Sequence, residues 1–279
     1  MIITFANHKG GVGKTTLTLA FAIYLSNRFP NKRILLIDVD PQSNLTASLI
    51  GTIPTKNVMD AFYDVVRGSF DDCRVYIWES DVLPGYHIIP STLDMIKVES
   101  QLTTTAFKPT ELLRPIIQSA KQHYDFILID TPPSLGLWTR NALMATDHVI
   151  VPTLFDNISL YGLNDILLQI SLARQNRGAY PKLAGIIGNR LDLRYKVHHR
   201  NYQVLKKNMG EKFVEPPIPT SSRTTGSAKM LYNAIVKGDR ARLRRSLLAV
   251  FDAIYQRMES EASENERKEE KEEIAVREN

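Results

Sequence analysis

Residues 9–15 read Lys-Gly-Gly-Val-Gly-Lys-Thr, a short run that combines glycines, two lysines and a hydroxyl group. Phosphate groups bind where successive backbone N–H groups converge, where a helix begins, and where a lysine neutralises the charge. The glycines allow the backbone to wrap closely around phosphate oxygens. In such loops the lysine, here Lys14, reaches the β- and γ-phosphates, and the hydroxyl, here Thr15, ligates Mg²⁺. The run therefore predicts a nucleotide-phosphate site that uses magnesium.

The run departs from the usual phosphate-loop pattern, G-x-x-x-x-G-K-[ST], at its first position. His8 stands where that pattern has its first glycine, and Lys9 follows directly. The ordinary consensus therefore fails, and a second lysine precedes the glycines instead. The residues of this stretch that are expected to bind the nucleotide are Lys9, Gly10, Gly11, Val12, Gly13, Lys14, Thr15 and Thr16.

Carboxylates follow two other apolar runs. Residues 33–38 lead into the segment Asp-Val-Asp-Pro-Gln-Ser-Asn at 38–44, and residues 125–130 lead into Asp-Thr-Pro-Pro-Ser at 130–134. An aspartate after a strand can simply be a helix cap or a turn former. Here the two strand ends that carry aspartates would lie close to the glycine-rich loop, which favours a metal-assisted phosphate site.

These loops need a sheet that places them side by side. Apolar runs without alternation indicate buried strands at 2–6, 33–38, 125–130, 148–152 and 183–188. Helical spacing indicates helices at 15–26, 160–174, 202–209, 228–235 and 247–258. The pattern predicts an α/β fold of three layers, α/β/α, with helices on both faces of a mostly parallel twisted sheet. Ligands bind at the carboxyl ends of such strands, so the loops after Ala6, Asp38 and Asp130 should be neighbours.

The stretch around Lys9 resembles the ParA/MinD family of deviant Walker P-loop ATPases. The segment 38–44 is similar to that family's D-x-D-P-Q-x-N segment, residues 130–134 to its Walker B and switch II segment, and residues 87–94 to its I-P-A-x-x-x-L segment. The resemblance covers residues 1–258 in order and is nearest to ParA/Soj-like partition ATPases, McdA-like carboxysome-positioning ATPases included. It implies the P-loop NTPase fold with ATP and Mg²⁺ as cofactors.

The resemblance also implies roles in the reaction. Lys9 would reach the nucleotide of a partner subunit, so that ATP holds together a sandwich homodimer. Asp40 would position Mg²⁺ and the attacking water, Asp130 would hold the water shell of Mg²⁺, and Asp38 could lie behind the metal. The sequence alone does not decide how these roles are divided between Asp38 and Asp40. The expected catalytic set is Lys9, Lys14, Asp40 and Asp38, and the expected metal set is Thr15, Asp40 and Asp130.

The base of the nucleotide has a less distinct site. Asn189, at the end of the apolar run 183–188, resembles the strand-end asparagine that contacts adenine in this family, although an asparagine there is also a routine turn former. Pro219 resembles the residue that covers the base. The chemistry would be in-line attack of water on the γ-phosphate. Such enzymes are slow switches that a partner stimulates.

The net charge of +5 hides a polarised distribution. Between positions 174 and 245 there are 17 Lys and Arg against four acids, which favours a polyanion as partner, although a solvated basic face is the alternative for any single residue. Arg223 resembles the arginine of the family's I-P-x-x-x-R segment, which contacts DNA without sequence preference. The predicted contacts to duplex DNA are Arg223, Arg194, Lys206, Lys207, Lys229, Arg242 and Arg245.

Three other functions fit the sequence less well. A MinD-like membrane-associated regulator of cell division needs a C-terminal amphipathic helix, whereas the last twenty residues are acidic and poor in large apolar groups. An electron donor like the nitrogenase iron protein needs cluster-ligating cysteines, and Cys73 is the only cysteine. A metabolic P-loop synthetase, or an inert nucleotide-binding module, fits the segments at 38–44 and 130–134 poorly.

The chain should form one ATPase domain over residues 1–258, followed by an acidic, flexible tail at 259–279. No apolar run approaches the roughly 18 residues of a membrane span, so we expect a cytoplasmic, nucleoid-associated protein without integral membrane association. The expected partners are a second copy, nonspecific duplex DNA and a ParB-like or McdB-like adaptor. The cargo, a plasmid, a chromosome or a protein organelle such as the carboxysome, is not encoded in any motif.

Overall fold

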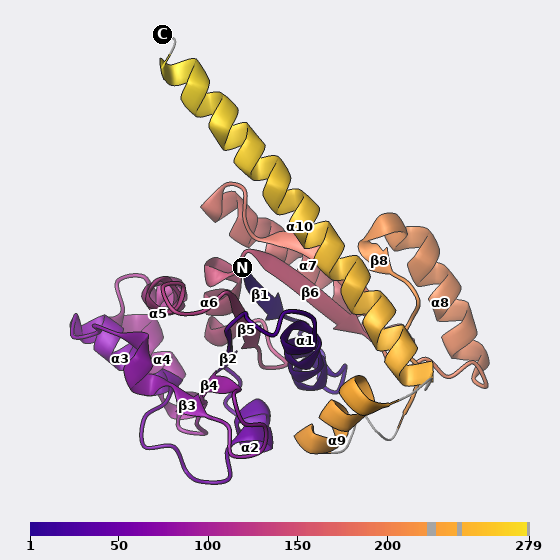
Figure 1. The fold of residues 1–279 in the computed structure, drawn as a ribbon, viewed down its shortest axis with the longest axis horizontal. Coiled ribbons are helices and arrows are strands. Elements are labelled where there is room, and N and C mark those ends of the chain that lie inside the picture. The colour runs from indigo at the N-terminus through magenta and orange to yellow at the C-terminus, as the bar shows by residue number, and fades with distance from the viewer. Residues whose placement is uncertain (222–226, 239–241, 278–279) are drawn as a thin grey trace.

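A computed structural model describes the chain at residues 1–221, 227–238 and 242–277, with side chains described except at 158, 160, 161 and from 264 onward. Its centre is an eight-stranded sheet in the order β3-β4-β2-β5-β1-β6-β7-β8 (Figure 1). All neighbouring strands are parallel except β3, which pairs antiparallel with β4. The strands are β1 (Ile2–Phe5), β2 (Ile34–Asp38), β3 (Trp78–Glu79), β4 (His87–Ile89), β5 (Phe126–Asp130), β6 (His148–Thr153), β7 (Lys182–Gly188) and β8 (Phe213–Val214).

Helices cover both faces of the sheet, as the sequence predicted. One face packs against α1 (Lys14–Arg28), α2 (Asn44–Leu49), α9 (Ala228–Tyr232), the π-helical turn η5 (Asn233–Lys237) and α10 (Arg242–Arg277). The other face packs against α3 (Val58–Arg67), α4 (Met95–Thr105), α5 (Leu113–Ala120), α6 (Leu137–Ala145), α7 (Asn157–Arg177) and α8 (Lys196–Met209). Three short 3₁₀ turns, η1 (Cys73–Tyr76), η2 (Pro109–Glu111) and η3 (Gly210–Lys212), complete the described elements.

The continuous apolar strands reflect this double coverage. In β2, Ile34 and Leu36 face the side of α1, whereas Leu35 and Ile37 face the side of α3 to α6. All five residues of β2 are buried. Because both faces are covered, neither face of the strand can be polar, and the alternation of a one-sided strand is absent.

The register of the central strands brings three loops to one edge. Asp130, the last residue of β5, pairs with Asp38 of β2 on one side and with Phe5 of β1 on the other. The glycine-rich loop follows β1, so it lies next to the loop after β5, which lies next to the loop after β2. The predicted convergence of the three loops is confirmed.

Several elements differ from the sequence-based expectation. The helix expected at 202–209 begins six residues earlier, at Lys196, and β3, β4 and β8 have only two or three residues each, too few for a periodic pattern. The helix expected at 247–258 is α10, which starts at Arg242 and continues to Arg277 (Figure 1). The flexibility of the acidic tail stays a prediction. Within the described residues, no helix is long and apolar enough to cross a bilayer.

Candidate nucleotide-binding site

The glycine-rich loop joins β1 to α1 in a conformation that needs glycine. Gly11 and Gly13 have φ angles of 76° and 94°, in the left-handed region. Gly13 is also crowded, because a β-carbon there would lie 2.4 Å from Nδ2 of Asn189. No side chain caps the start of α1 at Lys14, so the N–H groups of its first turn are available to an anion.

A cavity of about 360 Å³ opens beside this loop, at the carboxyl edge of the sheet. Five of the predicted phosphate-loop residues, together with Thr16, lie on its wall, and so does Asp40 from the loop after β2. The cavity is lined by Gly10, Gly11, Gly13, Lys14, Thr15, Thr16, Asp40, Gln42, Asn44, Ser48, Pro133 and Arg190.

The two lysines of the loop point to different places. Lys14 is buried on the cavity wall, and its Nζ lies 3.4 Å from the carbonyl oxygen of Lys9. Burial lowers the pKa of Lys14, although Asp130 and Asp40 act to raise it. Lys9 is not part of the cavity wall, and its Nζ donates to both carboxylate oxygens of Asp156, at 2.7 and 2.8 Å.

Asp156 is the residue that caps the start of α7. Its Oδ1 accepts a hydrogen bond from the backbone N–H of Ser159 at 2.7 Å, and the Ser159 hydroxyl donates to its Oδ2 at 3.1 Å. His8 also meets this helix, because a β-carbon on Gly162 would lie 2.4 Å from the His8 ring. His8 therefore contacts α7 and Lys9 contacts the residue that caps it. No sequence motif predicted these contacts.

Asp38 is fully buried behind the cavity and does not line it. Its oxygens accept hydrogen bonds from the backbone N–H of Asp40 and from the N–H and hydroxyl of Thr46, at 2.8 to 3.0 Å. Burial raises the pKa of Asp38 to about 7, against these hydrogen bonds, which lower it. It therefore holds the backbone of Asp40 in place, and its role in the reaction stays a prediction.

Asp40 lies on the cavity wall, whereas Asp130, the last residue of β5, is fully buried and is not part of that wall. Oδ1 of Asp40 accepts a hydrogen bond from the N–H of Gln42 at 2.9 Å, and burial raises the pKa of Asp40. Burial raises the pKa of Asp130 well above its usual value, with Asp38 adding to the shift and the Thr15 hydroxyl opposing it. Among the described residues, Oδ2 of Asp130 is buried without a hydrogen-bond partner. Such an orphaned acceptor beside Thr15 fits the water shell of a bound Mg²⁺.

Asn189, at the end of β7, touches the phosphate loop directly. Its side-chain Nδ2 donates to the carbonyl oxygen of Val12 at 2.9 Å, while its Oδ1 accepts from the N–H of Arg190. Pro219 forms an isolated parallel bridge with Leu191, so the two predicted base-site residues lie in adjacent segments. Pro219 borders a second cavity, of about 450 Å³, rather than the phosphate cavity.

The chain is similar to known proteins over most of its length. A family model of the AAA domain matches residues 1–183, which include the phosphate loop and both carboxylate loops. The sporulation initiation inhibitor protein Soj of Bacillus subtilis is 32% identical over 85% of this chain and 93% of Soj. The chromosome partitioning protein ParA of Caulobacter vibrioides is 30% identical over 87% of this chain and 91% of ParA. The chain belongs to the ParA/MinD family of P-loop ATPases.

Solved structures share the fold of this ParA/MinD-family chain. Cobyrinic acid a,c-diamide synthase from Mycobacterium smegmatis, with a bound ATP analogue and magnesium, has a TM-score of 0.68 and 27% identity over 85% of this chain and 92% of the synthase. McdA from Cyanothece, without ligand, has a TM-score of 0.75 and 20% identity over 92% of this chain and 98% of McdA. The likeness to McdA at this identity shows a common fold.

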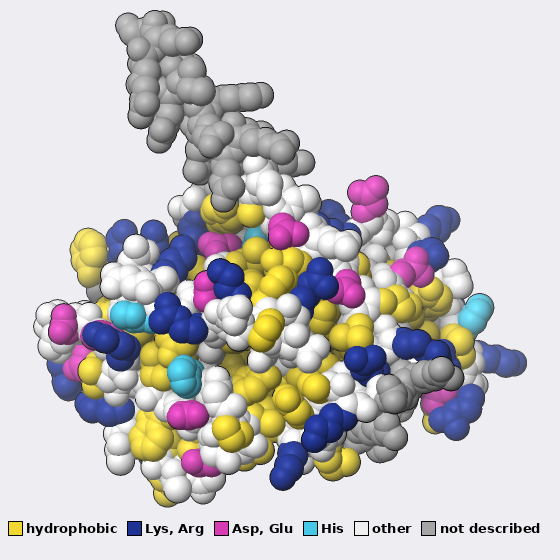
Figure 2. Space-filling model, viewed as in Figure 1, with side chains coloured by type: hydrophobic (Ala, Val, Ile, Leu, Met, Phe, Trp, Pro, Cys, Tyr) yellow, Lys and Arg dark blue, Asp and Glu magenta, His cyan; other side chains and the backbone are white. Residues whose placement is uncertain are grey.

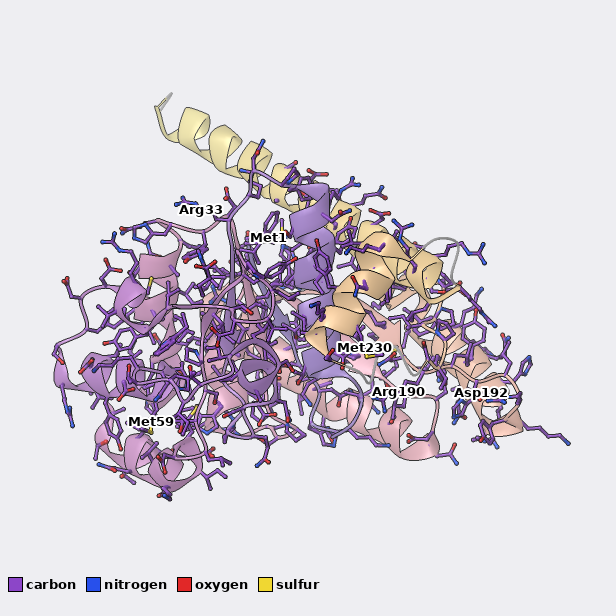
Figure 3. All side chains as sticks on the ribbon, turned by 60° about the horizontal axis from the view of Figure 1, so that its bottom comes forward. Met1, Arg33, Met59, Arg190, Asp192 and Met230 are labelled. Atoms are coloured by element: carbon purple, nitrogen blue, oxygen red, sulfur yellow. The ribbon has the colours of Figure 1, made fainter. Side chains whose placement is uncertain are left out.

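Sequence reasoning missed part of the wall of the cavity in this ParA/MinD-family chain. Gln42 and Asn44 belong to the recognised segment 38–44 but had no predicted contact, and Ser48 follows on α2. Arg190 lines the cavity with a φ of 56°, and Figure 3 places it after β7, on the side of the molecule that carries α8. Only its position next to Asn189 could have suggested it.

The basic residues predicted to bind DNA fall into two groups. Arg194 is paired with Asp192, its Nη2 lying 2.5 Å from Oδ2, and Lys206 is paired with Glu215 at 2.8 Å. Arg194 and Arg242 border the second cavity beside Pro219. Lys207 of α8, Lys229 of α9, and Arg242 and Arg245 of α10 are exposed. Arg223 lies outside the described residues.

Proposed function

We propose that this chain is an ATP-dependent dimerisation switch. It binds ATP with Mg²⁺ at the cavity beside the phosphate loop, pairs with a second copy across the nucleotides, and hydrolyses ATP slowly. The ATP-bound dimer holds duplex DNA without sequence preference, and an adaptor protein stimulates hydrolysis to release it. This places the protein on the nucleoid in the cytoplasm, where it positions a cargo.

One observation carries the proposal, namely that Lys14 and Lys9 diverge. Lys14 reaches the wall of its own cavity, whereas Lys9 is held at Asp156, outside that wall. A single-subunit phosphate site needs one lysine, and Lys14 supplies it. A second lysine that turns away from its own site is suited to the nucleotide of a facing subunit.

The chain's own groups suit hydrolysis by in-line attack of water. Lys14 neutralises phosphate charge, the N–H groups at the start of α1 face the phosphates, and Asp40 orients the attacking water from the cavity wall. Thr15 and Asp130 would hold Mg²⁺ and its waters, and the ion would supply charge neutralisation across the β- and γ-phosphates. Asp38, buried behind Asp40, fixes the loop that carries it.

The proposed DNA binding and cargo positioning are supported by the similar proteins and by the basic charge of one stretch of the chain. Soj and ParA cover most of this chain, and the name of the second assigns it to chromosome partitioning. McdA shares the fold, which keeps a protein organelle among the candidate cargoes. The stretch 174–245 carries 17 basic residues against four acids, and such a surface attracts a polyanion. A MinD-like association with membranes is the alternative output.

The proposal is tested by sedimentation equilibrium with ATP, ADP or ATP plus EDTA, each with Mg²⁺ otherwise present. We expect a dimer only in the sample with ATP and Mg²⁺. In separate assays, this sample should release phosphate slowly and should be the only one that retains duplex DNA. A monomer in all three samples that releases phosphate steadily would contradict the dimer. ATP turnover only with an added carboxylate and an amide donor would instead support a synthetase.

A further inference from the structure

A serine that follows β4 contacts the loop that carries Asp40. Ser91 lies two residues after the end of β4, the strand that pairs with β2, and it is buried. Its hydroxyl donates to the carbonyl oxygen of Asp40 at 2.7 Å, and the same oxygen accepts from the N–H of Ser43 at 2.8 Å. The hydroxyl also lies 3.1 Å from Sδ of Met95, which is a weaker acceptor than a carbonyl oxygen. Ser91 therefore holds the backbone of Asp40 from outside the loop.

Four residues form a closed ring of hydrogen bonds around this contact. The N–H of Ser91 donates to Oγ1 of Thr46 at 2.9 Å, and the Thr46 hydroxyl donates to Oδ2 of Asp38 at 2.8 Å. Oδ1 of Asp38 accepts from the N–H of Asp40 at 3.0 Å, and the Ser91 hydroxyl closes the ring at the Asp40 carbonyl. Asp40 is therefore held on both sides of its α-carbon, at its N–H and at its carbonyl oxygen.

The ring lies inside the molecule, where water does not compete for its hydrogen bonds. Figure 2 shows acidic, basic and apolar side chains together on the surface where Figure 1 places α3 and α4. None of the four ring residues is more than 6% exposed. Hydrogen bonds are stronger in such an environment because the local dielectric constant is low. The ring is therefore suited to hold the loop after β2 in one geometry.

Position 91 is also a place where this chain differs from the segment that it resembles. The pattern I-P-A-x-x-x-L has alanine after its proline, whereas this chain has Ser91 after Pro90. Alanine has no side-chain donor, so only the serine can form the hydrogen bond to the Asp40 carbonyl.

We propose that Ser91 is a positioning residue for ATP hydrolysis, which acts by fixing the backbone of Asp40. The inference rests on the proposed function, in which the Asp40 carboxylate orients the attacking water. Asp40 lies on the wall of the phosphate cavity, and its Oδ1 accepts from the N–H of Gln42 at 2.9 Å. A side chain that starts from a fixed backbone keeps its oxygens in one place. Loss of one of these hydrogen bonds lets them shift, and a small misplacement lowers the rate of a reaction that depends on orientation.

The test needs a matched control for the loss of a buried hydroxyl. Ser91→Ala removes the hydroxyl but keeps the N–H that contacts Thr46, and alanine fits the space of serine. Ser80→Ala is the control, because the Ser80 hydroxyl is also buried and donates to a carbonyl oxygen, that of Leu49, at 2.8 Å. Neither Ser80 nor Leu49 lines the phosphate cavity.

The parent and both variants are compared in two assays with Mg²⁺, namely single-turnover hydrolysis of ATP and equilibrium binding of ATP. The substitution Ser91→Ala is also made in an Asp40→Ala background. Urea unfolding and sedimentation check that each variant folds and dimerises. We expect Ser91→Ala to hydrolyse ATP about tenfold more slowly than the parent, with an affinity for ATP within about twofold. Ser80→Ala should stay within about twofold of the parent in both assays.

The Asp40→Ala background separates positioning from a direct role. If Ser91 acts through Asp40, Ser91→Ala should slow Asp40→Ala no further. Three results would each overturn the inference and leave the proposed function intact: a parental rate in Ser91→Ala, an equal loss in Ser80→Ala, or a further tenfold loss in the double variant. Hydrolysis by Asp40→Ala at the parental rate would instead overturn the role of Asp40 in the proposed function, and the role of Ser91 with it.

Discussion

Nζ of Lys9 forms hydrogen bonds with both carboxylate oxygens of Asp156, at 2.7 and 2.8 Å, although the two residues are 147 positions apart. The lysine that is expected to act on a partner's nucleotide is therefore occupied within its own subunit. The Lys9 side chain is 23% exposed and that of Asp156 is 38% exposed, so water screens the pair. Release of Lys9 should cost little, at most about 1 kcal/mol.

Asp156→Asn should strengthen the ATP-dependent dimer. Asparagine can still cap the start of α7, because its side-chain oxygen accepts the N–H of Ser159, but it no longer holds the charge of Lys9. Each protomer must release one Lys9, so removing two pairs worth up to about 1 kcal/mol each predicts a dimer dissociation constant lower by up to about 30-fold. Sedimentation velocity with ATP measures this. A dimer weaker than that of the parent would show that Asp156 acts in the dimer itself.

Asp40→Ala should trap ATP in a long-lived dimer. Asp40 lies on the cavity wall and is the carboxylate best placed to orient the attacking water, whereas nucleotide affinity depends mainly on the phosphate loop. We expect phosphate release to fall by at least about 100-fold, as typical for loss of a group that assists proton transfer or positions water. Bound nucleotide recovered after gel filtration should be ATP. Phosphate release at the parental rate would refute the role of Asp40.

Gly13→Ala should destabilise the folded chain more than Gly68→Ala. Both glycines have positive φ, at 94° and 73°, so alanine strains the backbone at either position. Only at Gly13 would the new β-carbon collide, 2.4 Å from Nδ2 of Asn189, whereas Gly68 has open space. We expect about 1 kcal/mol lost at Gly68 and about 2 kcal/mol or more at Gly13, measured by urea unfolding without nucleotide. Equal losses would mean that Asn189 moves aside freely.

Much of the architecture could be predicted because it depends on long, uniform patterns. The five apolar runs became β1, β2, β5, β6 and β7. Their parallel direction could be predicted because segments long enough for helices separate them. Strand ends in a parallel sheet share one edge, so the three loops of the phosphate site were expected to meet. The short strands β3, β4 and β8 carry no detectable period and depend on neighbours in space.

The pairing of charges could not be predicted, because it depends on tertiary approach. Lys206 on α8 and Glu215 after β8 are nine positions apart, and Lys9 meets Asp156 only once β1 and β6 lie side by side. Sequence patterning therefore could not separate Arg194 and Lys206, which are paired with carboxylates, from the other predicted cations. Arg190 was missed because no recognised motif includes it, although it lines the cavity and has a left-handed φ.

His148 should make stability depend on pH. It is buried at the start of β6, and burial lowers its pKa from 6.5 to about 4. The folded state therefore resists protonation that the unfolded state accepts, so stability is full above about pH 6.5 and falls as pH drops toward 4. The expected loss at pH 4 is about 3 kcal/mol.

His148→Leu removes this group and serves as the comparison. Unfolding free energies of both proteins are measured in urea from pH 7.5 to 4. The value for the parent minus the value for the variant should fall steadily below pH 6.5. Glu261 has Oε2 3.7 Å from Nδ1 of His148, and its charge would favour the protonated ring. A difference that stays constant with pH would show that Glu261 offsets burial.

Lys9→Ala and Lys14→Ala should separate two steps of the proposed switch. Lys14 lines its own cavity, so Lys14→Ala should abolish ATP binding by the monomer. Lys9 lies outside that wall, so Lys9→Ala should leave monomer affinity for ATP within about threefold of the parent.

The decisive measurement is sedimentation equilibrium of Lys9→Ala with saturating ATP and Mg²⁺, beside the parent chain. We expect the parent to be a dimer and the variant to stay monomeric at concentrations at least about 100-fold above the parent's dissociation constant. An ATP-bound Lys9→Ala dimer of parental affinity would contradict a nucleotide site shared between two subunits.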